Sequence, residues 1–182
     1  VMDIDFDALI ANETDSTLKD MHEYFRDRTP TEKNQYTGMF QGKNLLLFTG
    51  EAFWIGAVNE QYTPTLYKLA HSGFVFENFY NPLWYYSTVD GEYAATTGLI
   101  PTNQVNASQR YAGKNGVSMY FSMGNQLRAL GYPTLAYHNN TANYYDRNLS
   151  HPNLGYDFYA CDTGLDVAMT WPQSDLEMMQ LT

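Results

Sequence analysis

The segment YYSTVDGEYAATTGLIP, residues 85–101, brings hydroxyl and carboxylate side chains together at the start of a predicted helix. Thr88, Asp90 and Glu92 lead into small helix-forming residues, and a Gly-Leu-Ile-Pro exit follows. Thr88 is either an ordinary N-cap, with the two carboxylates complementing the helix dipole, or a nucleophile held at the helix N-terminus. The segment alone leaves both interpretations open.

Three further candidates for chemistry lie elsewhere in the chain. Glu51 follows the apolar run of residues 44–49, and His138 lies near the end of a later predicted strand. Functional groups collect at the carboxyl ends of parallel strands, which makes both positions candidates. Taken singly, each also has a plain structural role: Glu51 as a solvated loop carboxylate, His138 as a core histidine, and Arg147 as the partner of a nearby acid.

Strands and helices that alternate along the chain must position these groups. They predict an α/β fold with a mostly parallel sheet and helices on both faces. The predicted strands are residues 44–49, 74–81, 133–139 and 156–160. The predicted helices are residues 64–72, 88–98, 118–130 and 174–182. Thr63 is expected to cap the first of these helices, and Ser174 with Glu177 forms a capping box for the last.

Residues 1–42 differ in composition from the rest of the chain. They are polar and charged, with a helical pattern that Asp15, Ser16 or Thr17 is expected to cap and that Pro30 ends. We therefore expect an N-terminal helical arm or connector over residues 1–42, lying against a domain that begins at residue 43.

Composition narrows the class of protein. The 182 residues are 44% hydrophobic and 16% charged, which predicts a folded globular chain with a sizeable core. A net charge of −10 without any cluster of Lys or Arg argues against a nucleic-acid partner. Cys161 is the only cysteine, so an internal disulfide and a cysteine-based metal motif are both excluded. The chain opens on Val1 without a signal peptide, and its longest apolar run is too short to span a bilayer.

Four blocks occur in order with regular spacing: KNLLLFTGEAF, TPTLYKLAHSGFVFENFYN, STVDGEYAATTGLIP and ALGYPTLAYHNNTANYYDRNLSHPNLGYDFY. Together they resemble the lipoteichoic acid synthase family, which are sulfatase-like enzymes of the alkaline phosphatase superfamily. Four consecutive blocks are much more specific than any one of them. The resemblance runs from about Lys43 to the end of the chain and implies the α/β fold of that superfamily, here in truncated form.

The resemblance implies a role for each matching residue. Glu51 matches a glutamate that binds a divalent cation, and Thr88 matches the threonine that is both nucleophile and metal ligand. The positions that match the pocket for a glycerol phosphate head group are His138, Asn140, Tyr145 and Arg147. The expected cation is Mn²⁺, with Mg²⁺ and Zn²⁺ also compatible with oxygen ligands.

The implied reaction is phosphoglycerol transfer. Thr88 attacks the phosphodiester of an anionic glycerophospholipid, diacylglycerol leaves, and a covalent glycerophospho-threonine remains. The end of a growing glycerophosphate polymer then accepts the glycerophosphate. The resemblance places this domain outside the cytoplasm at the cell membrane, with membrane-spanning segments that this chain does not contain.

The match departs from the family in two ways. The best-known synthases carry an acid in place of Asn140 and Trp in place of Tyr145, which could alter the accepted head group. In the family, an Asp-His pair of metal ligands and a further substrate histidine lie in the C-terminal half of the domain, which this chain is expected not to reach. We therefore expect an incomplete fragment that binds metal weakly and turns over little substrate. We also expect its unpaired sheet edge to favour self-association or pairing with the missing C-terminal part.

Alternative functions remain within the superfamily and outside it. Phosphoethanolamine transfer and phosphatase activity use similar chemistry. A sulfatase is disfavoured because STVDGE lacks the Cys/Ser-x-Pro-x-Arg pattern of classical sulfatases. A non-catalytic domain that binds glycerophosphate or wall polymers would need the head-group pocket but not Thr88.

Overall fold

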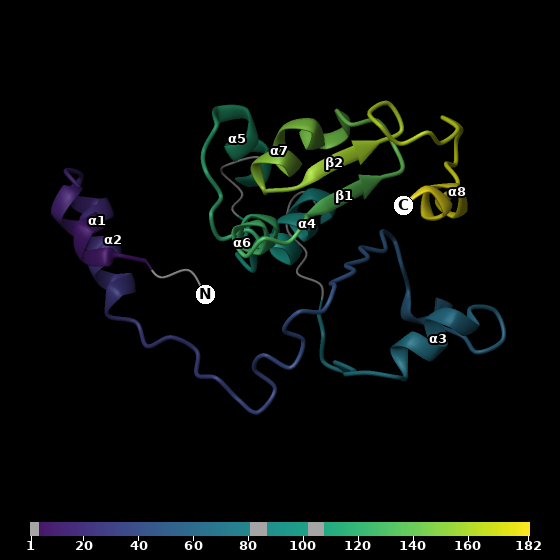
Figure 1. The fold of residues 1–182 in the computed structure, drawn as a ribbon, viewed down its shortest axis with the longest axis horizontal. Coiled ribbons are helices and arrows are strands. Elements are labelled where there is room, and N and C mark those ends of the chain that lie inside the picture. Colours follow the sequence, from purple (N-terminus) through teal and green to yellow (C-terminus); the bar gives the residue numbers. More distant parts are fainter. Residues whose placement is uncertain (1–3, 81–86, 102–107) are drawn as a thin grey trace. The chain divides into compact units, whose positions relative to one another are not determined.

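The computed structural model describes residues 4–80, 87–101 and 108–182 of the chain (Figure 1). The chain divides into two compact units, Val1–Phe48 and Thr49–Thr182. The predicted arm of residues 1–42 falls within the first unit, while the boundary at residue 43 stays a prediction. Within the described ranges, no helix combines the length and the apolar character that a membrane crossing requires.

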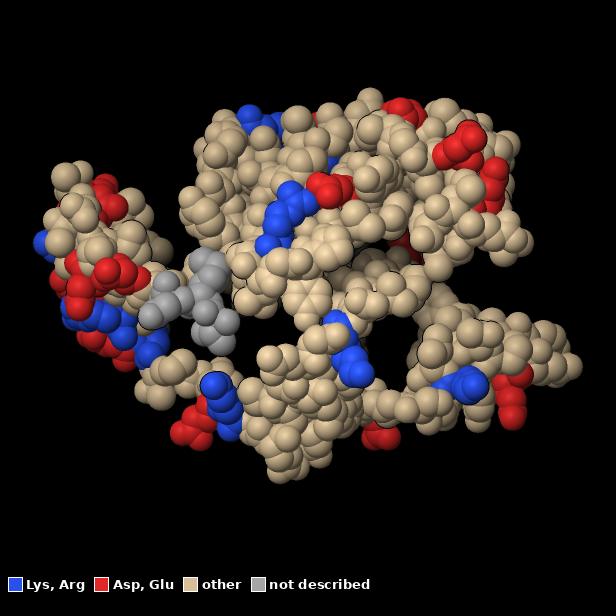
Figure 2. Space-filling model, viewed as in Figure 1, with Lys and Arg blue, Asp and Glu red and all other residues tan. Residues whose placement is uncertain are grey.

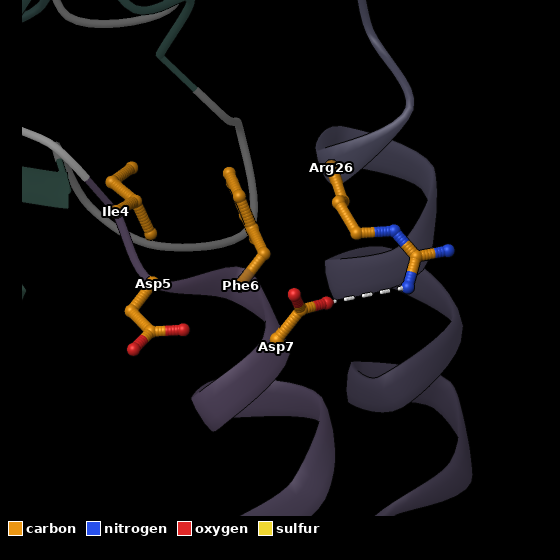
Figure 3. A pocket seen from close by; sticks show the side chains of 5 residues that line it. All are labelled: Ile4, Asp5, Phe6, Asp7 and Arg26. Atoms are coloured by element: carbon orange, nitrogen blue, oxygen red, sulfur yellow. Dashed lines mark ion pairs between the residues drawn. The ribbon is translucent and has the colours of Figure 1, made fainter.

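The first unit is built on a pair of helices, α1 (Phe6–Asn12) and α2 (Ser16–Arg26). Asp15 caps α2 by accepting a 3.0 Å hydrogen bond from the backbone N–H of Leu18, as one of the three candidate caps. The preceding helix, α1, was not expected. A shallow pocket between the two helices is lined by Ile4, Asp5, Phe6, Asp7 and Arg26 (Figure 3).

The second unit contains a two-stranded parallel sheet (Figure 1). Strand β1 (Leu135–His138) pairs with β2 (Asp157–Ala160), so that His138 lies opposite Ala160. The connection between the strands runs through the 3₁₀ turn η2 (Tyr144–Asp146) and helix α7 (Arg147–Asn153). This β-helix-β unit confirms the predicted strands at 133–139 and 156–160 and the mixed α/β class.

The other two predicted strands are wrong. Residues 44–49 and the described part of 74–81 have no regular secondary structure. Their apolar side chains are exposed: Leu46 keeps 79% and Phe76 74% of its accessible surface. A strand forms only where a partner satisfies its backbone N–H and C=O groups, and neither run has a partner strand among the described residues. Glu51 consequently lies in a turn and not at the end of a strand.

The described part of the second unit has five more α-helices and one more 3₁₀ turn. They are η1 (Ile55–Ala57), α3 (Pro64–Ala70), α4 (Ser87–Thr97), α5 (Ser108–Asn115), α6 (Met123–Ala129) and α8 (Asp175–Leu181). Helix α4 confirms the prediction at 88–98. The helix predicted from residue 118 begins only at Met123, because the buried Ser122 caps it and also donates a 2.7 Å hydrogen bond to the carbonyl of Leu154. Helix α5 was not expected.

Two predicted caps take the right position with different contacts. Thr63 is the N-cap of α3, but its hydroxyl donates to the carbonyl of Ala57 instead of capping the helix. Ser174 caps α8 by accepting from the N–H of Glu177 at 3.1 Å. The Glu177 carboxylate instead accepts from the N–H of Ala168, so the capping box is only half formed.

The core of the second unit is small and partly polar. Among the described residues of this unit, the buried apolar ones are Val89, Tyr93, Ala112, Ala142, Leu154, Ala160, Leu165 and Val167. Helix α5 approaches α7 closely at Gly113, where a Cβ atom would lie 2.8 Å from the Leu149 carbonyl oxygen. Figure 2 shows charged side chains of both signs interspersed among uncharged ones on one face, without a broad basic patch.

Candidate active site

Thr88 and Glu51 meet in the structure although 37 residues separate them in the chain. The Thr88 hydroxyl donates a 2.7 Å hydrogen bond to Oε1 of Glu51. Thr88 is half-buried in the first turn of α4, and Glu51 is exposed in the turn after residue 50. The N-cap interpretation of Thr88 is wrong, because α4 already begins at Ser87 and the Thr88 hydroxyl is directed at a distant carboxylate.

This pair offers two oxygen atoms to a divalent cation. A carboxylate and a hydroxyl are hard donors of the kind that Mn²⁺ and Mg²⁺ bind, and atoms 2.7 Å apart can share one ion. Among the described residues, no group of three or more His, Cys, Asp or Glu side chains is arranged to hold a metal. Glu51 and Thr88 therefore fit as part of a ligand set and do not complete one.

Arg147 is the centre of a second, more buried group. Its side chain is only 3% exposed, and it forms an ion pair with Glu92 of α4, which is 16% exposed. Nε lies 2.9 Å from Glu92 Oε1, and Nη2 contacts the same oxygen. Nη1 lies 3.0 Å from Nε2 of His138 and 3.3 Å from the carbonyl of Tyr144. The guanidinium therefore joins α4, the end of β1 and η2.

His138 lies at the carboxyl end of β1, as predicted. Arginine has no acceptor atom, so Nε2 of His138 accepts from Arg147 and the ring proton is on Nδ1. The Nδ1 atom is buried and has no hydrogen-bond partner within the described part of the chain. Burial, followed by the charge of Arg147, lowers the pKa of His138 from 6.5 to about 4. This histidine is therefore neutral at neutral pH.

Two tyrosines cover the Arg147 guanidinium. Its central carbon lies 5.3 Å from the ring centre of Tyr145 and 5.8 Å from that of Tyr144. The Tyr144 ring also stacks on His138 at 6.3 Å and 12°. Tyr145 and Asp146 both adopt left-handed backbone conformations, with φ of 58° and 57°. This bend turns the chain from η2 into α7 and brings the rings over Arg147.

The bend at Tyr145 and Asp146 is stabilised by ion pairs between Asp146 and two basic residues. Asp146 accepts hydrogen bonds from Nε of Arg110 at 2.9 Å and pairs with Nζ of Lys114 at 3.0 Å. Both basic residues come from α5. Hydrogen bonds from Arg110, then from Lys114, lower the pKa of the Asp146 carboxyl. Helix α5 thereby supports the tyrosine loop, and the sequence had not indicated its existence.

Asn140 forms its hydrogen bonds with its own loop and with the residue after β2. Its Oδ1 accepts a 2.7 Å bond from the N–H of Thr141, and its carbonyl accepts from the N–H of Cys161. The structure thus joins Glu51 with Thr88, and separately His138 and Tyr145 with Arg147. It gives Asn140 a role in shaping its own loop.

Three residues in this region were not predicted as site residues: Glu92, Gln109 and Tyr144. Glu92 had been interpreted as a complement to the helix dipole. The available signal was its spacing, because residues four apart, such as Thr88 and Glu92, share one face of a helix. No comparable signal pointed to Gln109, which is fully buried and donates a 3.0 Å bond to Glu92 Oε2.

Two half-buried histidines, His138 and His151, predict a pH-dependent stability. Burial and the charge of Arg147 also lower the pKa of His151 to about 4. Between pH 6.5 and 4 the unfolded chain binds protons that folded His138 and His151 do not, so the free energy of unfolding falls as the pH falls through this window. Shifts from 6.5 to about 4 correspond to about 3 kcal/mol per histidine, and partial exposure reduces the expected loss to about 1–2 kcal/mol each.

Urea unfolding of the 182-residue chain at several pH values measures this loss. The double variant His138→Gln/His151→Gln should show a flatter pH dependence between pH 6.5 and 4. A double variant with the wild-type slope would contradict the assignment.

Comparison with known proteins places the chain in a family. Residues 43–179 match the model of the sulfatase family. The chain is also similar to lipoteichoic acid synthase 2 of Bacillus subtilis (strain 168), at 26% identity over 153 residues. That alignment covers 78% of this chain and 22% of the relative, so the chain spans less than a quarter of the relative's length. No solved structure gives a significant match. Since the matched range takes in most of the chain, including Thr88, Glu51 and Arg147, this protein belongs to the sulfatase family.

Proposed function

We propose that this chain is part of a divalent-cation-dependent phosphoglycerol transferase of the lipoteichoic acid synthase kind. The observation that carries the proposal is the 2.7 Å hydrogen bond between the Thr88 hydroxyl and Glu51. It puts a candidate nucleophile beside a candidate metal ligand, on the range that matches the sulfatase family. The similarity to a lipoteichoic acid synthase supports transfer of glycerophosphate over other reactions of the family.

In the proposed reaction, Oγ of Thr88 attacks the phosphorus of an anionic glycerophospholipid. The Thr88 hydroxyl gives up its proton as the bond from Oγ to phosphorus forms, the bond from phosphorus to the diacylglycerol oxygen breaks, and that oxygen takes up one proton to leave as an alcohol. The hydroxyl of a glycerophosphate polymer then attacks the same phosphorus and frees Thr88, which regains its proton. Glu51 orients the Thr88 hydroxyl by accepting its hydrogen bond.

Glu51 and Thr88 would hold the cation in this proposal, as two of its oxygen ligands. A bound divalent cation, Mn²⁺ first with Mg²⁺ and Zn²⁺ as alternatives, supplies positive charge that polarises the phosphoryl oxygens and lowers the proton affinity of the hydroxyl. The backbone N–H groups at the start of α4 add a smaller field of the same sign near Thr88.

The head-group pocket is proposed to consist of His138, Asn140, Tyr145 and Arg147. The Tyr144 ring stacks on His138, and the rings of Tyr144 and Tyr145 offer flat walls to a glycerol unit. An anionic lipid donor implies that the reaction takes place at a membrane surface, and we propose the extracytoplasmic side of the cell membrane.

The choice of lipid tests the proposal. The full-length gene product, supplied with Mn²⁺ and vesicles of phosphatidylglycerol, should release diacylglycerol and carry a glycerophosphate adduct on the peptide that contains Thr88. Vesicles of phosphatidylethanolamine should give neither product. The measurements are lipid chromatography and mass spectrometry of the digested protein.

The alternatives predict other results in the same assay. A phosphoethanolamine transferase would release diacylglycerol only from phosphatidylethanolamine. Hydrolysis of a nitrophenyl sulfate or phosphate without lipid turnover would indicate a sulfatase or phosphatase. Retention of glycerophosphate polymer without any turnover would indicate a binding domain, and each of these outcomes would overturn the proposal.

A further inference from the structure

Most of the donors of Arg147 are already committed to neighbouring groups in the protein. Arginine has five N–H groups: one on Nε and two on each Nη. The Nε–H and one Nη2–H point to Oε1 of Glu92. Nη1 contacts both Nε2 of His138 and the carbonyl of Tyr144. Among the described residues one N–H of Nη2 is left without an acceptor, so Arg147 has a single N–H, and not a pair, to offer to a phosphate.

Glu92 is held as firmly as the arginine that it binds. Its second oxygen, Oε2, accepts a 3.0 Å bond from Nε2 of Gln109, whose side chain is completely buried. The two oxygens of Glu92 therefore face two different donors from α5 and α7. A glutamate fixed at both oxygens leaves the guanidinium little freedom to rotate.

Arg147 also contacts His138, so a fixed guanidinium fixes the protonation of a residue in the proposed head-group pocket. Because Nη1 fills the acceptor on Nε2, His138 is held as the Nδ1–H tautomer. If the guanidinium rotated, Nε2 would lose its donor and the two tautomers would become closer in energy. Glu92 also lies one helical turn after Thr88 on α4, so the same helix carries the candidate nucleophile and the anchor of the pocket.

We propose that Glu92 is a positioning residue, which holds Arg147 so that His138 keeps one tautomer and its ring keeps its place beside the proposed head-group site. Glu92 itself does not touch the substrate. The part of this inference that concerns substrate rests on the proposed phosphoglycerol transfer, whereas the tautomer of His138 does not depend on any reaction.

The first test needs no substrate. The full-length gene product is labelled with ¹⁵N-histidine, and the His138 signals are identified by their loss in His138→Gln. We expect a protonated Nδ1 and an unprotonated Nε2 in the wild type, and averaged tautomer signals in Glu92→Gln. Glu92→Asp should give an intermediate spectrum, because it keeps the charge on a shorter side chain.

The second test separates positioning from chemistry. With phosphatidylglycerol vesicles and Mn²⁺, Glu92→Gln should raise KM about tenfold and leave kcat within about twofold, since the Thr88–Glu51 pair is unchanged. Glu60→Gln serves as the matched control, because Glu60 is an exposed glutamate of the same unit. It should behave as the wild type in both tests.

Several outcomes would overturn the inference. They are an unchanged His138 spectrum in Glu92→Gln, a wild-type KM in that variant, or a fall in kcat at unchanged KM.

Should Glu92→Gln fail to fold, Gln109→Met removes only the hydrogen bond to Oε2 of Glu92. It should shift the tautomer signals and KM in the same direction by a smaller amount. A wild-type result for folded Gln109→Met would then reject the inference. If the wild type turns over no lipid but Glu92→Gln changes the tautomer of His138 as expected, the proposed function fails. The role of Glu92 in positioning Arg147 and His138 then still stands.

Discussion

Thr88→Ala should reduce kcat for phosphoglycerol transfer by at least about a thousandfold in the full-length gene product, because removal of a covalent nucleophile leaves only binding and electrostatic effects. The substitution deletes the oxygen that would attack phosphorus and leaves Glu51 without its 2.7 Å donor. The measurement is diacylglycerol release from phosphatidylglycerol at saturating lipid. No glycerophosphate adduct should form on the peptide that contains residue 88.

Two variants control for effects on the helix itself. Thr88→Ser keeps a hydroxyl and should retain measurable turnover. Thr96→Ala removes another hydroxyl from α4, one that donates to the carbonyl of Glu92, and should leave kcat near the wild-type value. Thr88 is half-buried and makes one side-chain hydrogen bond within the described ranges, so Thr88→Ala should cost only about 1 kcal/mol of stability. Turnover that survives in Thr88→Ala would reject the covalent mechanism.

Arg147→Met should lower the free energy of unfolding by about 3–5 kcal/mol, as is typical when one partner of a buried ion pair is removed. The substitution leaves the Glu92 carboxylate, which is 16% exposed, without its cation. It also removes the donor to Nε2 of His138 and to the carbonyl of Tyr144. Urea unfolding of the 182-residue chain near pH 7 measures the change.

A double variant distinguishes a lost charge partner from lost packing. Arg147→Met/Glu92→Leu removes both charges, so it should be less destabilised than the sum of its single variants. Arg128→Met is the exposed control: Arg128 pairs with Asp157 while both side chains are about half exposed, and its loss should cost at most about 1 kcal/mol. Equal losses for Arg147→Met and Arg128→Met would show that the buried pair contributes no more than a surface pair.

The sequence predicted correctly helices α3, α4 and α8, each of which has a capping residue, proline or glycine at one end. Ser174 and Pro64 mark the starts of α8 and α3, and Gly98 follows the end of α4. The two strands that alternate with helices in the last third of the chain also formed as predicted. In each case the deciding interaction lies within a few residues, so a local pattern contains the information.

The same reasoning failed for the apolar runs at 44–49 and 74–80. Each has the composition of a strand, yet a strand depends on backbone partners that can come from any part of the chain. The prediction that Glu51 follows a strand failed with them. Glu51 nevertheless meets Thr88, so the contact does not depend on the sheet edge from which it was expected.

The sequence by itself determined which residue types are available for chemistry, the composition that disfavours nucleic-acid binding, and the motif order that resembles a sulfatase-like family. Only the tertiary structure decided which of these residues touch. It pairs Arg147 with Glu92, and it adds Gln109 from a helix that was not predicted. The physical reason is that hydrogen bonds and ion pairs act over about 3 Å in space, whereas sequence spacing reports neighbours only within one helix or strand.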